Sequence, residues 1–307
     1  MTKVFIDGSA GTTGLRIHER LSERKDLELL ILTDDVRKDP AARKEAINSC
    51  DIAFLCLPDT AAIEAVSMVE NPNVVIIDTS TAHRTAPGWT YGFPELGGMR
   101  EKISQSKRIA NPGCHASGFI ALVEPLVRAG LLKPETNFSC VSLTGYSGGG
   151  KSMIADYENP ERDGLLNAPR LYGLTQQHKH LKEMVVISGV GNAPAFCPIV
   201  APFYSGMEVT VPIFKEDLLG TRDDVEAVYR KAYENGLVKF SAEADENGFL
   251  SAGAFSGRDD MQITVAGNAE RLLLVARYDN LGKGASGAAI QNMNILLGVP
   301  EETGLTV

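Results

Sequence analysis

Short apolar runs alternate with segments of helical spacing over the first third of the chain. The strand-like runs are strongly apolar, and they cover residues 3–7, 28–33, 52–58, 74–78 and 108–110. Helical spacing follows the first run and returns at 60–69. Alternation of buried strands with helices at this pitch is typical of a parallel, doubly wound sheet. We therefore predict an α/β fold with an N-terminal Rossmann-type sheet.

The pattern changes after residue 138, where apolar and polar positions begin to alternate. Such alternation predicts strands that have one solvated face. The predicted strands lie at 138–143, 185–190, 207–214, 250–252, 261–266 and 272–277. A small-residue turn and a helix follow at 284–297. These segments indicate a second α+β domain with a mixed or antiparallel sheet.

The turn Asn111-Pro112-Gly113 delivers Cys114 to the start of an apolar helix that includes residues 119–127. Unpaired amides and the positive end of the helix dipole favour a thiolate there, and a thiolate is a nucleophile. His115 would add positive charge if it were protonated. The alternative for Cys114 is a small buried side chain without chemistry.

A glycine turn stands between the first predicted strand and the first helix. Its residues are Gly8, Ser9, Ala10, Gly11, Thr12, Thr13 and Gly14. Small residues let the backbone approach a pyrophosphate that rests on the helix N-terminus, so the turn predicts dinucleotide binding. The spacing G-x-x-G-x-x-G differs from the commoner G-x-G-x-x-G.

The end of the second predicted strand should face the adenosine ribose of that dinucleotide. It contains Thr33, two acidic residues, Arg37 and Lys38. An acid suits a free 2′-hydroxyl, whereas Arg37 and Lys38 suit a 2′-phosphate. We favour NADP(H), with an ordinary solvated turn as the alternative.

Two further strand ends hold candidate binding residues, because ligands of such sheets bind outside the carboxyl ends of the strands. Leu57 and Pro58 follow the third strand, and Ser80 follows the fourth. Arg84 lies in the same turn as Ser80, and its planar fork suits a phosphate or carboxylate. A surface arginine is the alternative.

A cysteine nucleophile beside a dinucleotide fold suggests acyl transfer to sulfur followed by hydride transfer. His178 and His180 are the candidate acid/base residues, and they share a face only if the backbone there is extended.

Residues 145–152 formally match a P-loop. That motif normally follows the first strand of its own domain, so we expect Ser147, Gly148 and Lys151 to bind an acyl phosphate or the nicotinamide end instead. A surface loop is the alternative.

Composition narrows the class of protein. A net charge of −9 over 307 residues argues against general affinity for nucleic acid or anionic membranes. No apolar run reaches the length of a membrane span, and no signal region precedes the first strand, so we expect a cytoplasmic protein. Five scattered cysteines predict neither a disulfide framework nor a metal site.

Five motifs occur in the order found in N-acetyl-gamma-glutamyl-phosphate reductases, and the chain resembles the shorter variety of that family along nearly its whole length. The motifs are the glycine turn at 8–14, Ser80-Thr81-Ala82-His83-Arg84, Asn111-Pro112-Gly113-Cys114, Ser147-Gly148-Gly149-Gly150-Lys151 and His178-x-His180. The resemblance implies NADPH-dependent reduction of N-acetyl-glutamyl 5-phosphate to the 5-semialdehyde and phosphate, a step of arginine synthesis. It also implies roles for residues: Cys114 forms the thioacyl intermediate, His178 or His180 is the acid/base, Arg84 binds phosphate, and Asn280 returns to the nicotinamide.

The resemblance also implies a domain division, with residues 1–113 and 285–307 binding NADP and residues 114–284 carrying catalysis and oligomerisation. The strands of the second domain are compatible with a homodimer or a homotetramer. His115-Ala116-Ser117 replaces the Tyr-Pro-Thr of the longer form, and Lys182 replaces a proline. These departures leave open the choice of histidine and a longer substrate such as N-acetyl-aminoadipyl phosphate. Aspartate-semialdehyde dehydrogenase is the rival enzyme, and an NADP-sensing regulator is the rival from another class.

Overall fold

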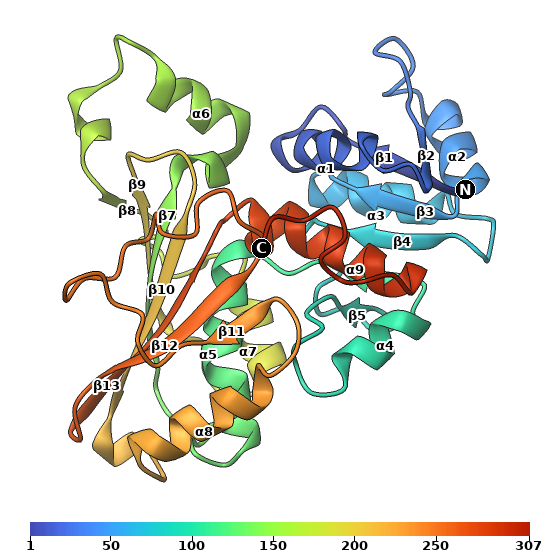
Figure 1. Ribbon diagram of the computed structural model, residues 1–307. Helices are drawn as coiled ribbons and strands as arrows, with labels where there is room; N and C mark the ends of the chain where they lie inside the picture. Colours follow the sequence, from blue (N-terminus) through green and yellow to red (C-terminus); the bar gives the residue numbers. More distant parts are fainter. The chain divides into compact units, whose positions relative to one another are not determined.

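The computed structural model describes residues 1–307, which form two compact units (Figure 1). The first unit contains residues 1–94, 98–112 and 285–305. The second contains residues 95–97, 113–284 and 306–307.

The first unit is built on a six-stranded sheet with the order β2-β1-β3-β4-β6-β5. All of its strand pairs are parallel, which confirms the predicted doubly wound class. The strands are β1 (Thr2–Asp7), β2 (Leu27–Leu30), β3 (Ile52–Leu55), β4 (Val75–Asp78), β5 (Thr90–Tyr91) and β6 (Arg108–Ala110). The chain moves to opposite sides of β1 when it forms β2 and β3, and ligands of such sheets bind at this switch point.

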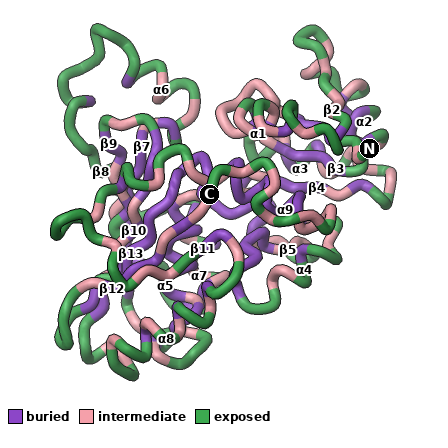
Figure 2. The backbone as a smooth tube through the Cα atoms, viewed as in Figure 1, coloured by how far each residue is buried: buried purple, intermediate pink, exposed green.

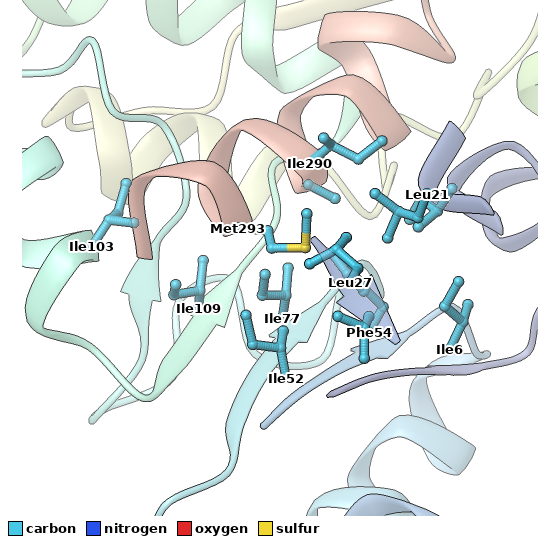
Figure 3. Close-up of a cluster of buried hydrophobic side chains, with 13 residues drawn as sticks. Ile6, Leu21, Leu27, Ile52, Phe54, Ile77, Ile103, Ile109, Ile290 and Met293 are labelled. Carbon is cyan, nitrogen blue, oxygen red and sulfur yellow. The ribbon is translucent and has the colours of Figure 1, made fainter. Parts of the chain in front are cut away.

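Helices cover both faces of this parallel sheet. The helices are α1 (Thr12–Ser22), α2 (Pro40–Ser49), α3 (Asp59–Ser67), α4 (Met99–Gln105) and α9 (Gly287–Leu297). Leu21 of α1 and Met293 of α9 pack with Phe54 and Ile77 on one face (Figure 3). Ile47 of α2 packs with a separate cluster on the other face. The last helix of the chain therefore belongs to the core of the first unit.

The second unit contains a mixed seven-stranded sheet with the order β11-β12-β13-β10-β7-β9-β8. The strands are β7 (Ser139–Gly145), β8 (Arg170–Leu171), β9 (Ala195–Ala201), β10 (Met207–Phe214), β11 (Val238–Phe240), β12 (Met261–Gly267) and β13 (Arg271–Tyr278). Most neighbouring strands are antiparallel, while β7 pairs with β9 and β11 pairs with β12 in parallel. The predicted mixed sheet is confirmed.

Helix α5 (Cys114–Arg128) packs on β10 and β13, with α7 (Leu181–Ser188) and α8 (Arg222–Ala232) beside it. Eleven of its fifteen residues are buried, which explains its continuous apolar sequence. The remaining helix, α6 (Gly150–Glu158), is mostly exposed, whereas most residues of the central strand β13 are buried (Figure 2).

Three predicted strands are wrong or too long. Residues 185–190 lie largely in helix α7, because Met184 and Ser188 are buried one turn apart and Gly189 ends the helix in the left-handed region. Residues 250–252 follow a tight turn and pair with no strand. The strand expected at 28–33 ends at Leu30, because β2 is an edge strand and Ile31 is exposed to solvent.

No helix in the structure combines the length and the apolar character that crossing a membrane requires. None of the five cysteines forms a disulfide.

Candidate functional site

In the glycine turn after β1, packing within the protein leaves no room for a side chain at two of the three glycines. Gly8 has a φ of +86°, and a Cβ there would lie 2.3 Å from the Cys56 carbonyl oxygen. A Cβ on Gly14 would lie 2.4 Å from the Gly8 carbonyl oxygen. Gly11 differs, because a Cβ there would meet nothing closer than 3.4 Å. Packing within the protein therefore does not require a glycine at position 11.

Helix α1 begins without any side-chain cap. Gly11 is its N-cap residue, and no side chain accepts a hydrogen bond from the first-turn amides. The Thr12 hydroxyl oxygen is buried and makes no hydrogen bond. Leaving a buried polar atom unpaired costs about 1–3 kcal/mol, so native proteins rarely keep one without a reason. Open amides and an unpaired hydroxyl at a glycine turn fit the pyrophosphate of a dinucleotide.

Two pockets flank this turn within the first unit. The first has a volume of about 240 Å³, and its lining includes Gly8, Ser9, Leu57, Arg37, Lys38 and Arg43. The second, of about 350 Å³, includes Ser9, Ala10, Thr33 and Arg37. Arg37 lines both pockets and forms an ion pair with exposed Asp34, with Nε 2.8 Å from Oδ1. The turn and the end of β2 thus meet at the switch point, where ligands of such sheets bind.

Arg43 is a pocket residue that the sequence did not reveal. It lies on α2, and its guanidinium binds the Asp7 carboxylate with an Nη2–Oδ2 distance of 3.0 Å. Both residues are buried. Burial raises the pKa of Asp7, and the Arg43 hydrogen bond opposes that shift. No local pattern around residue 43 marks it, since it reaches the pocket only through the packing of α2 on β1.

The turn after β4 is held by its own hydrogen bonds. The Ser80 hydroxyl donates to Asp78 Oδ2 at 2.7 Å, and His83 Nδ1 lies 2.6 Å from the same oxygen. Arg84 is buried, and it donates from Nε to the Asn111 carbonyl at 3.0 Å and from Nη2 to the Thr79 carbonyl at 3.1 Å. Arg84 therefore links this turn to the segment that leads to the cysteine. Whether it also binds phosphate stays a prediction.

Cys114 is the first residue of α5, as the turn chemistry predicted, and its side chain is partly exposed. The Tyr278 hydroxyl donates to the Cys114 carbonyl at 2.5 Å and accepts from the Gly118 amide at 3.0 Å. A Cβ at position 118 would lie 2.7 Å from that hydroxyl oxygen, which explains the glycine. Strand β13 thus fixes the first turn of the helix.

Glu183 is a second residue near the cysteine that the sequence did not single out. Its Oε2 accepts a hydrogen bond from the Gly113 amide at 3.1 Å, directly before Cys114. The carboxyl group is buried, and it occupies one of the amides that a helix start leaves open. Glu183 therefore fixes the backbone directly before Cys114.

Three histidines gather beside the start of α5. The ring centroids of His178 and His180 are 4.7 Å apart, and each is 5.7 Å from that of His115. We expected His178 and His180 to share a face only if the backbone between them were extended, and this expectation was wrong. Residues 178–181 form a turn, in which the His180 amide donates to His178 Nδ1 at 3.2 Å. His115 is also not a positive group, because burial lowers its pKa to about 3.

The second glycine loop is not a loop of free amides. Residues 146–149 form a 3₁₀ turn, and α6 starts at Gly150. Ser147 is buried and accepts a hydrogen bond from Asn280 Nδ2 at 2.9 Å, while Asn280 Oδ1 accepts from the Gly206 amide. Gly148 and Lys151 are exposed. Asn280 therefore ties two loops of the second unit together, and a role in cofactor binding stays a prediction.

Family models match each part of the chain. Residues 3–106 match the semialdehyde dehydrogenase NAD binding domain, and residues 114–280 match the semialdehyde dehydrogenase dimerisation domain. Among solved structures, aspartate semialdehyde dehydrogenase II from Vibrio cholerae, complexed with ASA, aligns with 97% of this chain at a TM-score of 0.70 and 16% identity. Aspartate semialdehyde dehydrogenase with NADP from Candida albicans aligns at a TM-score of 0.67 and 13% identity. These likenesses establish the shared fold.

Curated relatives are far more similar in sequence. The chain is 45% identical to N-acetyl-gamma-glutamyl-phosphate reductase 2 of a Nostoc species, over 99% of both chains. It is 44% identical to N-acetyl-gamma-glutamyl-phosphate reductase 2 of Pseudomonas putida, over 98% of both. The enzyme of that name from Rhizobium etli is 45% identical over 96% of this chain. Identity of this extent, over a chain whose two units match the two semialdehyde dehydrogenase domains, places the protein in the N-acetyl-gamma-glutamyl-phosphate reductase family.

Proposed function

We propose that the protein reduces N-acetyl-glutamyl 5-phosphate with NADPH, giving N-acetyl-glutamate 5-semialdehyde and phosphate. The observation that carries the proposal is identity of 44–45% to relatives named for this reductase over nearly the full chain. The site residues support it, since one unit presents a cysteine at a helix start and the other presents an uncapped glycine turn.

The two compact units suggest how the work is divided. We assign NADP binding to the first unit and catalysis to the second, close to the division at residues 1–113 with 285–307 and 114–284 that the sequence led us to expect. The glycine turn, with Gly11, Thr12 and Thr13 at the start of α1, would hold the pyrophosphate. When bound, NADPH supplies the hydride for the reaction.

Cys114 supplies the sulfur that attacks the acyl carbon of the substrate. A carbon–sulfur bond forms, the carbon–oxygen bond to phosphate breaks, and phosphate leaves with that electron pair. After hydride delivery to the same carbon, the carbon–sulfur bond breaks and the aldehyde is released, while the thiolate is regenerated. His178 or His180 would move the proton that these steps require, and Arg84, Ser147, Gly148 and Lys151 would hold the phosphate group.

Arg37 supports a preference for NADP(H) over NAD(H). It lines both pockets at the glycine turn, and Asp34 is the ionic partner that a 2′-phosphate would replace. Replacing Arg37 with methionine should raise the KM for NADPH about tenfold or more and leave the KM for NADH nearly unchanged, because a phosphate contact is worth about 1.5–3 kcal/mol.

The exposed face of the second sheet supports a dimer. Val141 and Leu273 are 38% and 41% exposed there, and Leu143, on the same strand as Val141, pairs in register with Ile199 of β9. Large exposed apolar patches mark protein interfaces. We propose that two copies pair through this face, so that Val141→Lys converts a dimer into a monomer in sedimentation experiments. A cytoplasmic location is also our expectation, in keeping with five cysteines that form no disulfide.

The deciding assay runs the reaction backwards and follows reduction of NADP+ with each semialdehyde plus phosphate. Turnover with N-acetyl-glutamate semialdehyde alone supports the proposal. Preference for aspartate semialdehyde points to the neighbouring enzyme, and preference for the N-acetyl-aminoadipate analogue points to a longer substrate. Tight NADP+ binding without turnover of any of them would indicate a sensor instead.

A further inference from the structure

A chain of hydrogen bonds runs from the sheet of the second unit to the neighbourhood of Cys114. Ser142 lies on β7, and its Oγ is 2.6 Å from Nδ1 of His115. The other ring nitrogen, Nε2, is 2.6 Å from the hydroxyl oxygen of Tyr172. Ser142 is completely buried and His115 is 3% exposed. Neither histidine of the His178-x-His180 motif takes part in these bonds.

The direction in which these hydrogen bonds donate follows from the number of protons available. His115 is neutral, because burial lowers its pKa to about 3, so one ring nitrogen donates and the other accepts. His115 is the only hydrogen-bond partner of the Ser142 hydroxyl. If Nδ1 carried the proton, the Ser142 proton would be buried without an acceptor, at a cost of about 1–3 kcal/mol. Ser142 therefore donates to Nδ1, and the imidazole proton is on Nε2.

This direction leaves the proton of Tyr172 available. Nε2–H donates to the Tyr172 oxygen, so the Tyr172 hydroxyl can donate in turn to a third group. Burial and the nearby Cys114 sulfur both raise the pKa of Tyr172, which keeps the hydroxyl protonated at neutral pH. Hydrogen bonds that run in one direction polarise one another, so the last donor in such a chain is strengthened.

We propose that Tyr172 donates this hydrogen bond to the substrate oxygen that becomes negative on Cys114, and that Ser142 and His115 are positioning residues that set its direction. When sulfur bonds to the acyl carbon, the carbonyl π electrons move onto oxygen. Tyr172 stabilises that oxyanion until the electrons return and expel phosphate. The same oxygen becomes negative again after hydride delivery, until the thiolate leaves. The proton stays on Tyr172 throughout.

The inference rests on the proposed reductase function, and the test separates the two. Wild-type enzyme, Tyr172→Phe, Ser142→Ala and the double variant are assayed with N-acetyl-glutamate semialdehyde, phosphate and NADP+. Removal of one oxyanion donor typically costs 10²–10³-fold in kcat, so Tyr172→Phe should lose about 100-fold with KM nearly unchanged. Ser142→Ala should lose about tenfold alone and nothing further in the Tyr172→Phe background, because it acts through Tyr172.

Two further measurements exclude a purely structural effect. The matched control is Tyr229→Phe. It removes a buried hydroxyl that donates to the Leu122 carbonyl of α5, the helix that begins at Cys114, and the kcat of this variant should stay at the wild-type value. The pH dependence of Cys114 alkylation by iodoacetamide should be the same in Tyr172→Phe and wild type, because the donor serves the oxyanion.

If the wild type is active and Tyr172→Phe is fully active, the inference about Tyr172 is overturned and the proposed function stands. Equal and additive losses from Ser142→Ala in both backgrounds also overturn it. A shifted alkylation profile would assign Tyr172 to the thiolate rather than to the oxyanion. Inactivity of the wild type refutes the proposed function itself.

Discussion

Helices α1 and α5 begin in the same way, and the protein treats the two starts differently. Each follows a strand of the parallel sheet through a turn, and each has a glycine at the N-cap with no capping side chain. At α1 the Thr12 hydroxyl is buried without a hydrogen bond. At α5 the Glu183 carboxylate accepts from the Gly113 amide, and Tyr278 occupies the first turn.

The difference matches the two roles that we propose for this local motif. The start of α1 keeps its polar groups open, which suits a ligand that arrives with its own negative charge. At the start of α5, by contrast, Glu183 binds the Gly113 amide and Tyr278 binds the Cys114 carbonyl, so groups of the protein fix the backbone on either side of the cysteine. The following experiments test this contrast, beginning with the largest expected effect.

Cys114→Ser should lower kcat by at least about 10³-fold, because a serine hydroxyl is a far weaker nucleophile than a thiolate. The dissociation constant for NADPH, measured by fluorescence titration, should not change. Cys50→Ala is the matched control, since Cys50 is buried in the first unit and burial raises its pKa to about 12. Unchanged turnover in Cys114→Ser would remove the nucleophile from our scheme.

Acidification should destabilise the second unit through His115. Its folded-state pKa of about 3 lies below the ordinary value of 6.5, so the unfolded chain binds the proton more readily. Stability is therefore complete above pH 6.5 and falls by about 1.4 kcal/mol for each unit below it, down to pH 3. Between pH 7.5 and 5.0 the free energy of unfolding should fall about 2 kcal/mol more in wild type than in His115→Asn, by urea denaturation. Equal slopes in the two proteins would contradict a neutral, buried imidazole.

Thr12→Val should have opposite effects on stability and on binding. Removal of an unpaired buried hydroxyl should stabilise the ligand-free protein by about 1 kcal/mol, while the Kd for NADPH rises about tenfold. Calorimetry measures both quantities. Thr221→Val is the contrasting control, because its hydroxyl accepts from the Asp224 amide at the start of α8, and its loss should destabilise the protein without affecting NADPH. If Thr12→Val binds NADPH as tightly as the wild type, the unpaired hydroxyl at the start of α1 does not contribute to cofactor binding.

Glu183→Gln should make Cys114 react at lower pH. Glutamine keeps an acceptor for the Gly113 amide and removes the charge, so the midpoint of iodoacetamide reactivity should fall by about half a unit. Glu124→Gln lies further along the same helix, next to Arg128, and should leave the midpoint in place. A midpoint that moves upward in Glu183→Gln would mean that the carboxyl group favours the thiolate.

The sequence predicted those parts of the fold that local pattern determines. The period of the apolar runs identified β1, β3 and β4, and turn chemistry placed Cys114 at the first residue of α5. Helix α7 was mistaken for a strand because its β-branched residues favour strands locally, whereas its packing against α5 decides the outcome. Helix α8 could have been found from Thr221 and Asp224, which form a capping box.

The site residues that escaped prediction act across long sequence separations. Glu183 meets Gly113 across 70 residues, and Tyr172 meets His115 across 57. Nothing in the local sequence of either partner signals the contact, because it exists only after the second sheet and its helices have packed. The glycine turn at 8–14 is the opposite case, since both of its packing glycines contact residues of the same turn or of the adjacent strand end.

The hydrogen bonds of Tyr278 indicate when the start of α5 forms during folding. Its hydroxyl joins the Cys114 carbonyl and the Gly118 amide across 164 and 160 residues. Contacts of such high sequence separation form late, because the entropy of closing a long loop must be overcome first. During synthesis, the first turn of α5 cannot take its final form until the last strand of the second sheet has left the ribosome. Cys114 is translated in the first half of the chain, yet the helix start that carries it takes its final form only near the end of translation.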